Sequence, residues 1–273
     1  MLKTRVISAV IAIPVVIAGV FIGGFWFFVG VTVVALIAGW EFGHLMKKGG
    51  YQTTHFFTLA LIALLLLDSI RSDLSLTCIL STILLSSLVW QLFQSDSTAP
   101  TADWALTIAG GLYIGWSLSH LVMLRNLGDG LAWVWLALLS TWGADTLAYF
   151  VGVSIGRNKL WPRLSPKKTW EGFFGGIIGG LIGAALVVPF SNLDWANALI
   201  IGAIVPVAGL FGDLSISMMK RHAGVKDSSN LFPGHGGFLD RIDSILFVSV
   251  VVYNYAVWSG AFSLSALSSL LGF

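Results

Sequence analysis

Two carboxylates in the C-terminal half of the chain, Asp213 and Asp240, are the first candidates for chemistry. Ser217 and Lys220 follow Asp213 at positions i+4 and i+7. If this stretch is helical, the three side chains share one face and bring a carboxylate, a hydroxyl and an ammonium group together. The alternative is a solvated helix end that carries a surface ion pair. The spacing alone is compatible with both interpretations.

A glycine-rich loop follows, and its composition suits an anion. It begins with Lys226 and Asp227 and ends with the run Pro-Gly-His-Gly-Gly at 233–237. Glycines lack a Cβ atom, so backbone N–H groups can approach an anion closely, and a helix that begins after them adds the positive end of its dipole. The loop therefore predicts a phosphate site, with an ordinary turn as the alternative.

Asp240 and Asp243 lie three residues apart where the next apolar span begins. At helical spacing they share a face and offer oxygen ligands of the type that Mg²⁺ prefers, with phosphate oxygens completing the shell. Acidic residues in a first helical turn are also common as capping residues. The combination with the glycine loop favours a metal and phosphate site.

A second cation-rich loop lies at residues 154–171 and contains Lys167 and Lys168. Adjacent lysines at a membrane surface often set topology or attract anionic lipid, at about 1 kcal/mol each. Binding of a substrate phosphate is the functional alternative. Asp145 and Glu171 favour it, since both are ionisable groups at membrane depth. Asp145 is predicted to be either a partner of one of these lysines or a metal ligand.

The elements that position these residues are membrane spans. The chain has 273 residues, of which 56% are hydrophobic and only 10% charged, and its mean hydropathy is +0.88. Charge-free runs recur that are long enough to cross the bilayer core. This composition excludes a water-soluble enzyme with one compact core and a disordered tail protein. A disulfide-stapled secreted module is excluded because Cys78 is the only cysteine.

We therefore predict an all-α, polytopic integral membrane protein with about nine transmembrane helices. The shortest predicted span, 55–70, is alternatively one arm of a tight hairpin. The predicted spans are 6–22, 25–45, 55–70, 74–93, 104–124, 130–153, 172–190, 195–212 and 242–262.

Charge distribution predicts the orientation. The start Met1–Arg5 resembles a signal peptide but lacks a small-residue cleavage site, so we expect an uncleaved first helix. With the N-terminus and every second loop in the cytoplasm, thirteen of the fifteen Lys and Arg residues face inward, and only Arg71 and Arg125 do not. This predicts a cytoplasmic N-terminus and a C-terminus on the outer side.

The charged loops divide the chain into two predicted regions: N-terminal transmembrane helices at 1–130, and a C-terminal transmembrane catalytic region at 131–273 with its site on the cytoplasmic side. Two interleaved ladders of glycine in the 172–190 span permit close helix approach. Packing within the monomer is the favoured interpretation of these ladders, and a homodimer interface is the alternative.

The run from Ser217 to Asp243 carries a resemblance. It reads Ser-x-x-Lys-Arg, then Lys-Asp after four residues, then Pro-Gly-His-Gly-Gly-x-x-Asp-Arg-x-Asp. This pattern resembles the signature of the phosphatidate cytidylyltransferases, also called CDP-diacylglycerol synthases. Trp-Gly-Ala-Asp at 142–145 and Ser-Pro-Lys-Lys-Thr-Trp-Glu-Gly at 165–172 also resemble bacterial members. The match covers residues 141–244, whereas the first 130 residues agree only in being apolar and in their Met-Leu-Lys-x-Arg start.

The resemblance implies a multi-pass enzyme of the bacterial inner membrane whose active site faces the cytoplasm. Such an enzyme condenses CTP with phosphatidic acid to CDP-diacylglycerol and pyrophosphate in phospholipid biosynthesis. The resemblance also implies dependence on Mg²⁺, with a second, monovalent cation as an option, and no nucleic-acid partner. Asp213 and Asp240 correspond to the family's metal-binding aspartates. The other matching signature positions are Ser217, Lys220, Arg221, Lys226, Asp227, His235, Arg241 and Asp243.

Roles for these residues follow from the charge of the two substrates. The lipid phosphate is already ionised, so no protein nucleophile is required, and positioning and charge stabilisation supply most of the catalysis. We expect Lys220, Arg221 and Lys226 to neutralise pyrophosphate and Lys167 or Lys168 to hold the lipid headgroup. His235 either donates to a phosphate oxygen or orients the loop. The remaining candidates are Asp227, Arg241 and Asp243 for catalysis, and Asp145, Ser217, Gly236 and Gly237 for substrate binding.

Two rival functions remain at this stage. One is an organic-anion transporter in which Asp145 and Asp213 couple to protons or Na⁺. Against it, the chain shows no matching pair of interrupted spans, and its charged motifs cluster in one half. The other rival is transfer of CMP to a different lipid phosphate, such as a prenyl ether lipid, which differs only in the acceptor.

Overall fold

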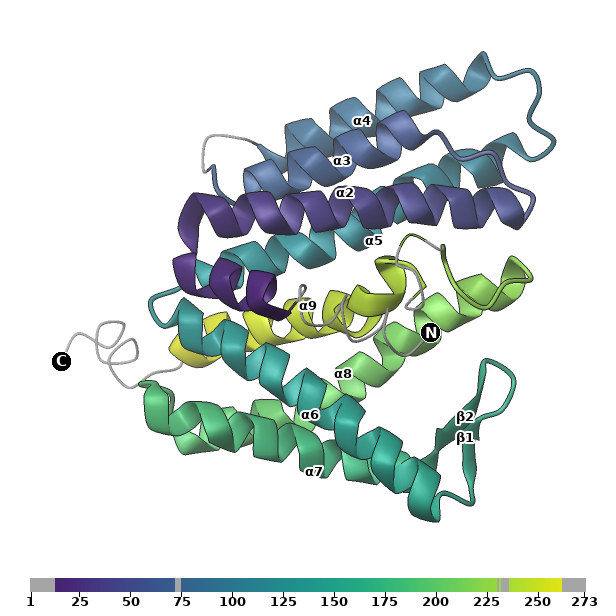
Figure 1. Ribbon diagram of the computed structural model, residues 1–273. Helices are drawn as coiled ribbons and strands as arrows, with labels where there is room; N and C mark the ends of the chain where they lie inside the picture. Colours follow the sequence, from purple (N-terminus) through teal and green to yellow (C-terminus); the bar gives the residue numbers. More distant parts are fainter. Residues whose placement is uncertain (1–12, 72–74, 230, 232–235, 262–273) are drawn as a thin grey trace.

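The protein is described by a computed structural model that covers residues 13–71, 75–229, 231 and 236–261 (Figure 1). The first predicted span falls partly outside these residues, and its described part is the helix Ile13–Ile22. The helices that follow are α2 (Gly24–Lys48), α3 (His55–Asp68), α4 (Leu76–Leu92), α5 (Pro100–Arg125), α6 (Gly130–Ile155), α7 (Trp170–Val187), α8 (Trp195–His222) and α9 (Leu239–Ala261). The strands are β1 (Lys159–Trp161) and β2 (Ser165–Thr169), and a 3₁₀ turn, η1, covers Val188–Phe190.

Within the described residues, six helices are long and apolar enough to cross a membrane: α2, α5, α6, α7 together with η1, α8 and α9. Ile13–Ile22, α3 and α4 are apolar but shorter. The predicted helical, polytopic architecture is therefore confirmed, and the described part of each predicted span coincides with a helix. The number of nine crossings and the orientation of the chain stay predictions, as does everything assigned to Met1–Arg5 and to residues 262–273.

Helix α9 lies between the N-terminal helices and the rest of the bundle (Figure 1). It packs against α2 and α5 on one side and against α6 and α8 on the other. Its inward side chains Leu246, Val248 and Val252 are fully buried. One hydrophobic cluster extends through this contact and includes Phe42 and Ile201, so the two predicted regions share a core.

Glycines bring α6, α7 and α8 into close contact. A Cβ atom on Gly179 would collide with the backbone of Gly143 in α6, and one on Gly180 would collide with Gly202 and Pro206 in α8. Glycines let helix backbones approach each other closely. Because lipid is as apolar as the side chains, helices in a membrane associate largely through such van der Waals contacts. The two ladders of the 172–190 span thus pack inside the chain.

The 154–171 loop contains a β-hairpin, an element that the all-helical prediction did not include. Strands β1 and β2 pair antiparallel, with Lys159 opposite Thr169 and Trp161 opposite Ser165. Thr169 ends the hairpin and caps α7, because its hydroxyl accepts a hydrogen bond from the Gly172 N–H at 3.1 Å. Neighbouring strand residues point to opposite faces, so the two adjacent lysines on β2 must diverge.

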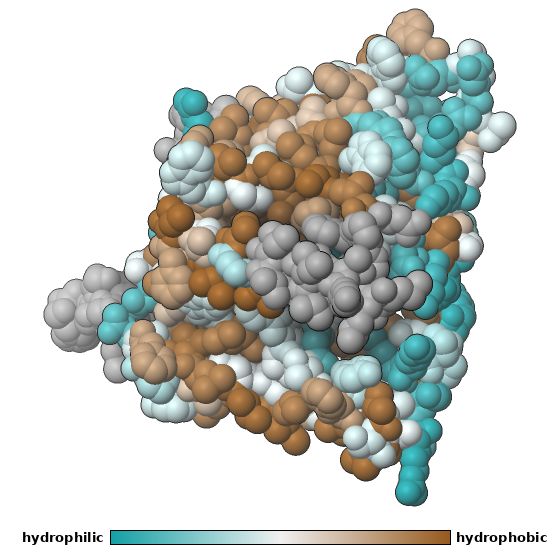
Figure 2. Space-filling model, viewed as in Figure 1, coloured by the Kyte–Doolittle hydropathy of each residue, from teal (hydrophilic) through white to brown (hydrophobic). Residues whose placement is uncertain are grey.

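Hydrophilic residues gather along one edge of the molecule, where the hairpin and the C-terminal end of α8 lie (Figure 2). We call this edge the polar end. The turn after α2 joins it, since Tyr51 stacks on His222 with ring centroids 5.6 Å apart. Away from the polar end, the described residues on this face are predominantly hydrophobic, as expected for a surface that contacts lipid.

Candidate active site

Asp240 lies in the first turn of α9 and forms an ion pair with Lys220, which lies in the last turn of α8. Lys220 Nζ lies 2.6 Å from Asp240 Oδ1, and the two side chains are only 11% and 7% exposed. The pair forms because the C-terminal end of α8 meets the N-terminal end of α9 at the polar end. The sequence placed Lys220 on the same helical face as Asp213. In the structure Lys220 pairs with a carboxylate of another helix, Asp240.

The second oxygen of Asp240 holds the glycine loop. Asp240 Oδ2 accepts hydrogen bonds from the Ser228 N–H at 2.8 Å, the Ser228 hydroxyl at 2.9 Å and the Gly237 N–H at 3.1 Å. The predicted anion-binding N–H of Gly237 therefore donates to a carboxylate of the protein itself. Gly236, which precedes it, has φ +78°, a conformation that favours glycine.

Asp213 forms the second ion pair of the site. The Ser217 hydroxyl donates to Asp213 Oδ1 at 3.1 Å, and because the segment is helical the predicted shared face of these two residues is confirmed. Lys168 Nζ reaches Asp213 Oδ2 at 2.7 Å, and these side chains are 26% and 32% exposed. Lys167 is exposed instead. Because neighbouring side chains on β2 point to opposite faces, Lys168 lies in the site and Lys167 does not.

Two further carboxylates interact electrostatically with Asp213. Asp145 on α6 interacts electrostatically with Lys168 and Asp213, and Asp243 with Asp213 and Lys220. A Cβ atom on Gly212 would collide with the Asp243 carbonyl, so α8 and α9 touch at this level. The two motifs that the sequence analysis singled out, around 145–168 and 213–243, therefore meet in one cluster of alternating charge.

The cluster fits Mg²⁺ by the chemistry of its donors. Carboxylate oxygens and the Ser217 hydroxyl are hard ligands, and Mg²⁺ commonly uses one or two carboxylates with substrate phosphates and water. Within the described part of the chain, no three Asp, Glu, His or Cys side chains converge as a complete metal site. A bound magnesium ion would accordingly need oxygens from a substrate.

The remaining signature residues have other positions. Arg221 braces the polar end, since its guanidinium donates to the carbonyls of Leu164 in the hairpin at 3.3 Å and of Val225 at 3.4 Å. Lys226, Asp227 and Arg241 are exposed at the polar end. His235 lies outside the described residues.

Sequence reasoning missed Glu41, a fully buried acid on α2 whose carboxylate accepts hydrogen bonds from the glycine loop and from the start of α9. The available signal was a single acid inside the predicted 25–45 span. An intramembrane carboxylate is a functional candidate by default. The spacing of residues around Glu41, however, does not predict which groups bond to it.

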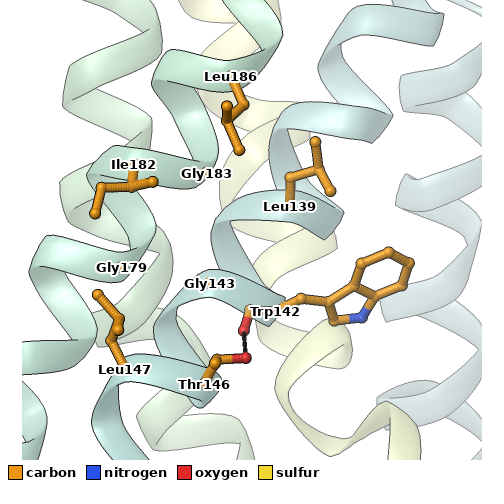
Figure 3. A pocket seen from close by; sticks show the side chains of 9 residues that line it. All are labelled: Leu139, Trp142, Gly143, Thr146, Leu147, Gly179, Ile182, Gly183 and Leu186. Atoms are coloured by element: carbon orange, nitrogen blue, oxygen red, sulfur yellow. Dashed lines mark hydrogen bonds between the residues drawn. The ribbon is translucent and has the colours of Figure 1, made fainter. Parts of the chain in front are cut away.

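A separate groove of about 310 Å³ lies between α6 and α7 (Figure 3). Its one hydroxyl-bearing side chain, Thr146, donates its proton to the Trp142 carbonyl at 2.7 Å. The groove has no ionisable side chain and cannot hold the charged chemistry. Its lining residues are Leu139, Trp142, Gly143, Thr146, Leu147, Gly179, Ile182, Gly183 and Leu186.

Comparison with known proteins identifies the family of the chain. The model of the cytidylyltransferase family matches residues 3–258. The chain is 34% identical over 265 residues to the phosphatidate cytidylyltransferase of Bacillus subtilis, which covers 92% of this chain and 96% of the relative. It is 34% identical over 275 residues to the enzyme of that name from Pseudomonas aeruginosa, covering 95% and 98% of the two chains. It is also 34% identical over 266 residues to that from Thermotoga maritima, covering 92% and 95%. With a family model matched over almost its whole length and the signature carboxylates gathered at one end of a membrane bundle, the chain belongs to the phosphatidate cytidylyltransferase family of nucleotidyltransferases.

Proposed function

We propose that this enzyme condenses CTP with phosphatidic acid, giving CDP-diacylglycerol and pyrophosphate. The observation that carries the proposal is the pair of neighbouring ion pairs, Lys168–Asp213 and Lys220–Asp240, at the polar end of a membrane bundle. Each pair combines a cation for phosphate with a carboxylate for a metal. The relatives' shared name supplies the two substrates.

The reaction needs positioning more than covalent participation by the protein. An ionised oxygen of the lipid phosphate attacks the α-phosphorus of CTP and forms a new P–O bond. The bond from that phosphorus to the bridging oxygen of the β-phosphate breaks, and pyrophosphate leaves with the electron pair. Because both reactants are anionic, cations that hold them together lower the barrier.

The lysines are the groups of this chain that receive those anions. A substrate phosphate competes with Asp213 for Lys168, and with Asp240 for Lys220. Lys168 would hold the lipid headgroup, while Lys220 and the exposed Lys226 would neutralise the triphosphate and the leaving pyrophosphate. Arg221 would maintain the hairpin and loop through its carbonyl contacts at 3.3 and 3.4 Å. Lys167, which points away, is suited to anionic headgroups of the surrounding lipid.

Asp213 and Asp240 would hold Mg²⁺, which when bound neutralises charge on the triphosphate. Ser217 would keep Asp213 in place through its hydrogen bond of 3.1 Å. Lys168 would do the same in the free enzyme. The assignment of Asp213 and Asp240 as metal ligands rests on their oxygen chemistry and on the family signature that they belong to.

We also propose that the polar end faces the cytoplasm of a bacterial cell. The cation-rich hairpin and the C-terminal end of α8 both lie at this end (Figure 2). Positive residues that flank membrane helices favour the cytoplasmic side. The orientation would place the site where CTP is made and leave the lipid substrate in the same leaflet.

The test uses the detergent-purified enzyme with CTP labelled on its α-phosphate, phosphatidic acid and Mg²⁺. We expect label to enter the lipid extract only when both substrates are present, and a chelator to abolish the transfer. Label that appears only with another lipid phosphate would change the acceptor. No transfer by a folded sample to any lipid phosphate would contradict the proposal and favour anion transport.

A further inference from the structure

Glu41 lies on α2, far from the site in sequence, and its side chain is fully buried. Its carboxylate receives four hydrogen bonds from one segment of the chain. Oε1 accepts from the Ser229 hydroxyl at 2.5 Å and the Phe238 N–H at 3.0 Å. Oε2 accepts from the Leu239 N–H at 2.8 Å and the Ser228 hydroxyl at 3.2 Å. One buried acid thus ties together the two ends of the glycine loop.

Two of these donors are at the start of α9. The first N–H groups of a helix have no partner within the helix, and the positive end of its dipole lies there. A carboxylate that accepts from Phe238 and Leu239 satisfies both requirements. Glu41 therefore caps α9 from a different helix and sets where the first turn begins, one residue before Asp240.

Ser228 connects Glu41 with Asp240. Its hydroxyl oxygen lies 2.9 Å from Asp240 Oδ2 and 3.2 Å from Glu41 Oε2. A hydroxyl has a single proton to donate, so the two carboxylates share it. Any shift of Glu41 would therefore be transmitted to Asp240 through this hydroxyl.

Gly237 provides an independent sign that this packing is tight. A Cβ atom at position 237 would collide with the Ser228 hydroxyl oxygen and would lie 2.6 and 2.8 Å from the two Glu41 oxygens. The glycine at this position leaves room for the carboxylate as well as donating its N–H to Asp240.

We infer that Glu41 is a positioning residue for the reaction: it holds the glycine loop and the first turn of α9 so that Asp240 and Lys220 meet in the geometry that the site requires. The inference rests on the proposed function, because the loop matters only if the chemistry occurs beside it. It also assigns a role in the site to the N-terminal helices, through a buried residue that acts by way of the loop and Asp240.

The test compares Glu41→Gln with a matched control, Asp103→Asn. Asp103 is another buried carboxylate that holds a loop at the polar end, accepting from the Gln52 N–H at 2.8 Å and the Ser97 hydroxyl at 2.5 Å. Amide hydrogen exchange is followed by mass spectrometry in the absence of substrates, and kcat and KM for CTP are measured separately.

We expect Glu41→Gln to accelerate exchange about tenfold in peptides covering 226–240, because hydrogen bonds to a charged acceptor are lost. Peptides from α6 and α7 should exchange at the wild-type rate. We expect kcat to fall about tenfold or more with a smaller change in KM, since misplaced groups affect the transition state most. Asp103→Asn should loosen the segments around residues 52 and 97, with exchange of 226–240 and kcat unchanged.

Ser228→Ala and Ser229→Ala each remove one hydrogen-bond donor to Glu41. They test the same contact if Glu41→Gln fails to fold. Each should accelerate exchange of 226–240 by a smaller factor. The Ser228→Ala and Glu41→Gln changes should be non-additive in kcat, because they interrupt one connection.

Three results would overturn the inference. The first is a wild-type rate of amide exchange at 226–240 in the serine variants and in any folded Glu41 variant, and the second is an acceleration of exchange spread evenly over the bundle. The third is faster exchange of the loop in a variant that keeps full activity. Because exchange needs no substrate, it decides the loop contact even if cytidylyl transfer is not found.

Discussion

Lys168 of strand β2 lies 2.7 Å from Asp213 of helix α8, although a complete membrane helix, α7, separates them in the chain. The hairpin before α7 and the last turns of α8 meet at the polar end, so two loops that look independent in the sequence form one site. The pair is about one-third exposed or less, which leaves it accessible to an anion that competes for the lysine.

Replacement of Asp213 by Asn should reduce turnover by about 10²-fold or more, because a ligand for the metal and an acceptor for Lys168 are lost together. The measurement is transfer of α-labelled CMP to lipid, with membrane insertion checked by chromatography in detergent. Asp194→Asn is the matched control. Asp194 caps the opposite end of the same helix by accepting from the Ala196 and Asn197 N–H groups, and its variant should keep activity. Near-normal turnover in Asp213→Asn would remove Asp213 from the metal site.

The two adjacent lysines should behave differently. Lys168→Ala should raise the KM for phosphatidic acid, or lower kcat/KM, about tenfold, because a phosphate contact is lost near the reacting centre. Lys167→Ala should change either constant by less than about threefold, as expected for an exposed charge. Steady-state kinetics in mixed micelles compare them. Unchanged kinetics in both variants would favour a purely topological role for the two lysines, and equal losses in both would contradict the distinction between Lys168 and Lys167.

Close packing of α6 against α7 should be sensitive to volume. Gly179→Val would push its side chain into the Gly143 backbone and should destabilise the protein by about 1–3 kcal/mol. Gly30→Ala is the control, since nothing lies within 4 Å of a Cβ atom there. Thermal unfolding in detergent measures both. Unchanged stability of Gly179→Val would show that the two helices separate more easily than their contact indicates.

The orientation is testable with reporter fusions. A reporter joined after Phe273 should be active outside the cytoplasm, and one inserted between α4 and α5, at residues 95–98, should be active inside it, because the latter loop lies at the polar end with Gln52 and Asp103. Two signals from the same side would require a different number of crossings.

Much of this architecture was predictable from local sequence. Apolar runs predict where helices lie, because a helix in lipid must satisfy its own backbone and present apolar side chains over the bilayer thickness. The Asp213–Ser217 contact followed from helical periodicity, since residues four apart on a helix are neighbours wherever that helix is placed. The spaced signature from Ser217 to Asp243 identified the family.

Tertiary structure decided the partners across helices. The choice of Lys168 over Lys167 depended on a hairpin, and the pairing of Lys220 with Asp240 on how α8 meets α9. Glu41 is the clearest example of a contact that the sequence does not predict. A single acid in an apolar span indicates that hydrogen-bond donors must lie near it, but not which donors. Its donors are at 228–239 because α2 packs beside α9. Contacts within one helix follow from its period, whereas contacts between helices depend on the packing of the whole bundle.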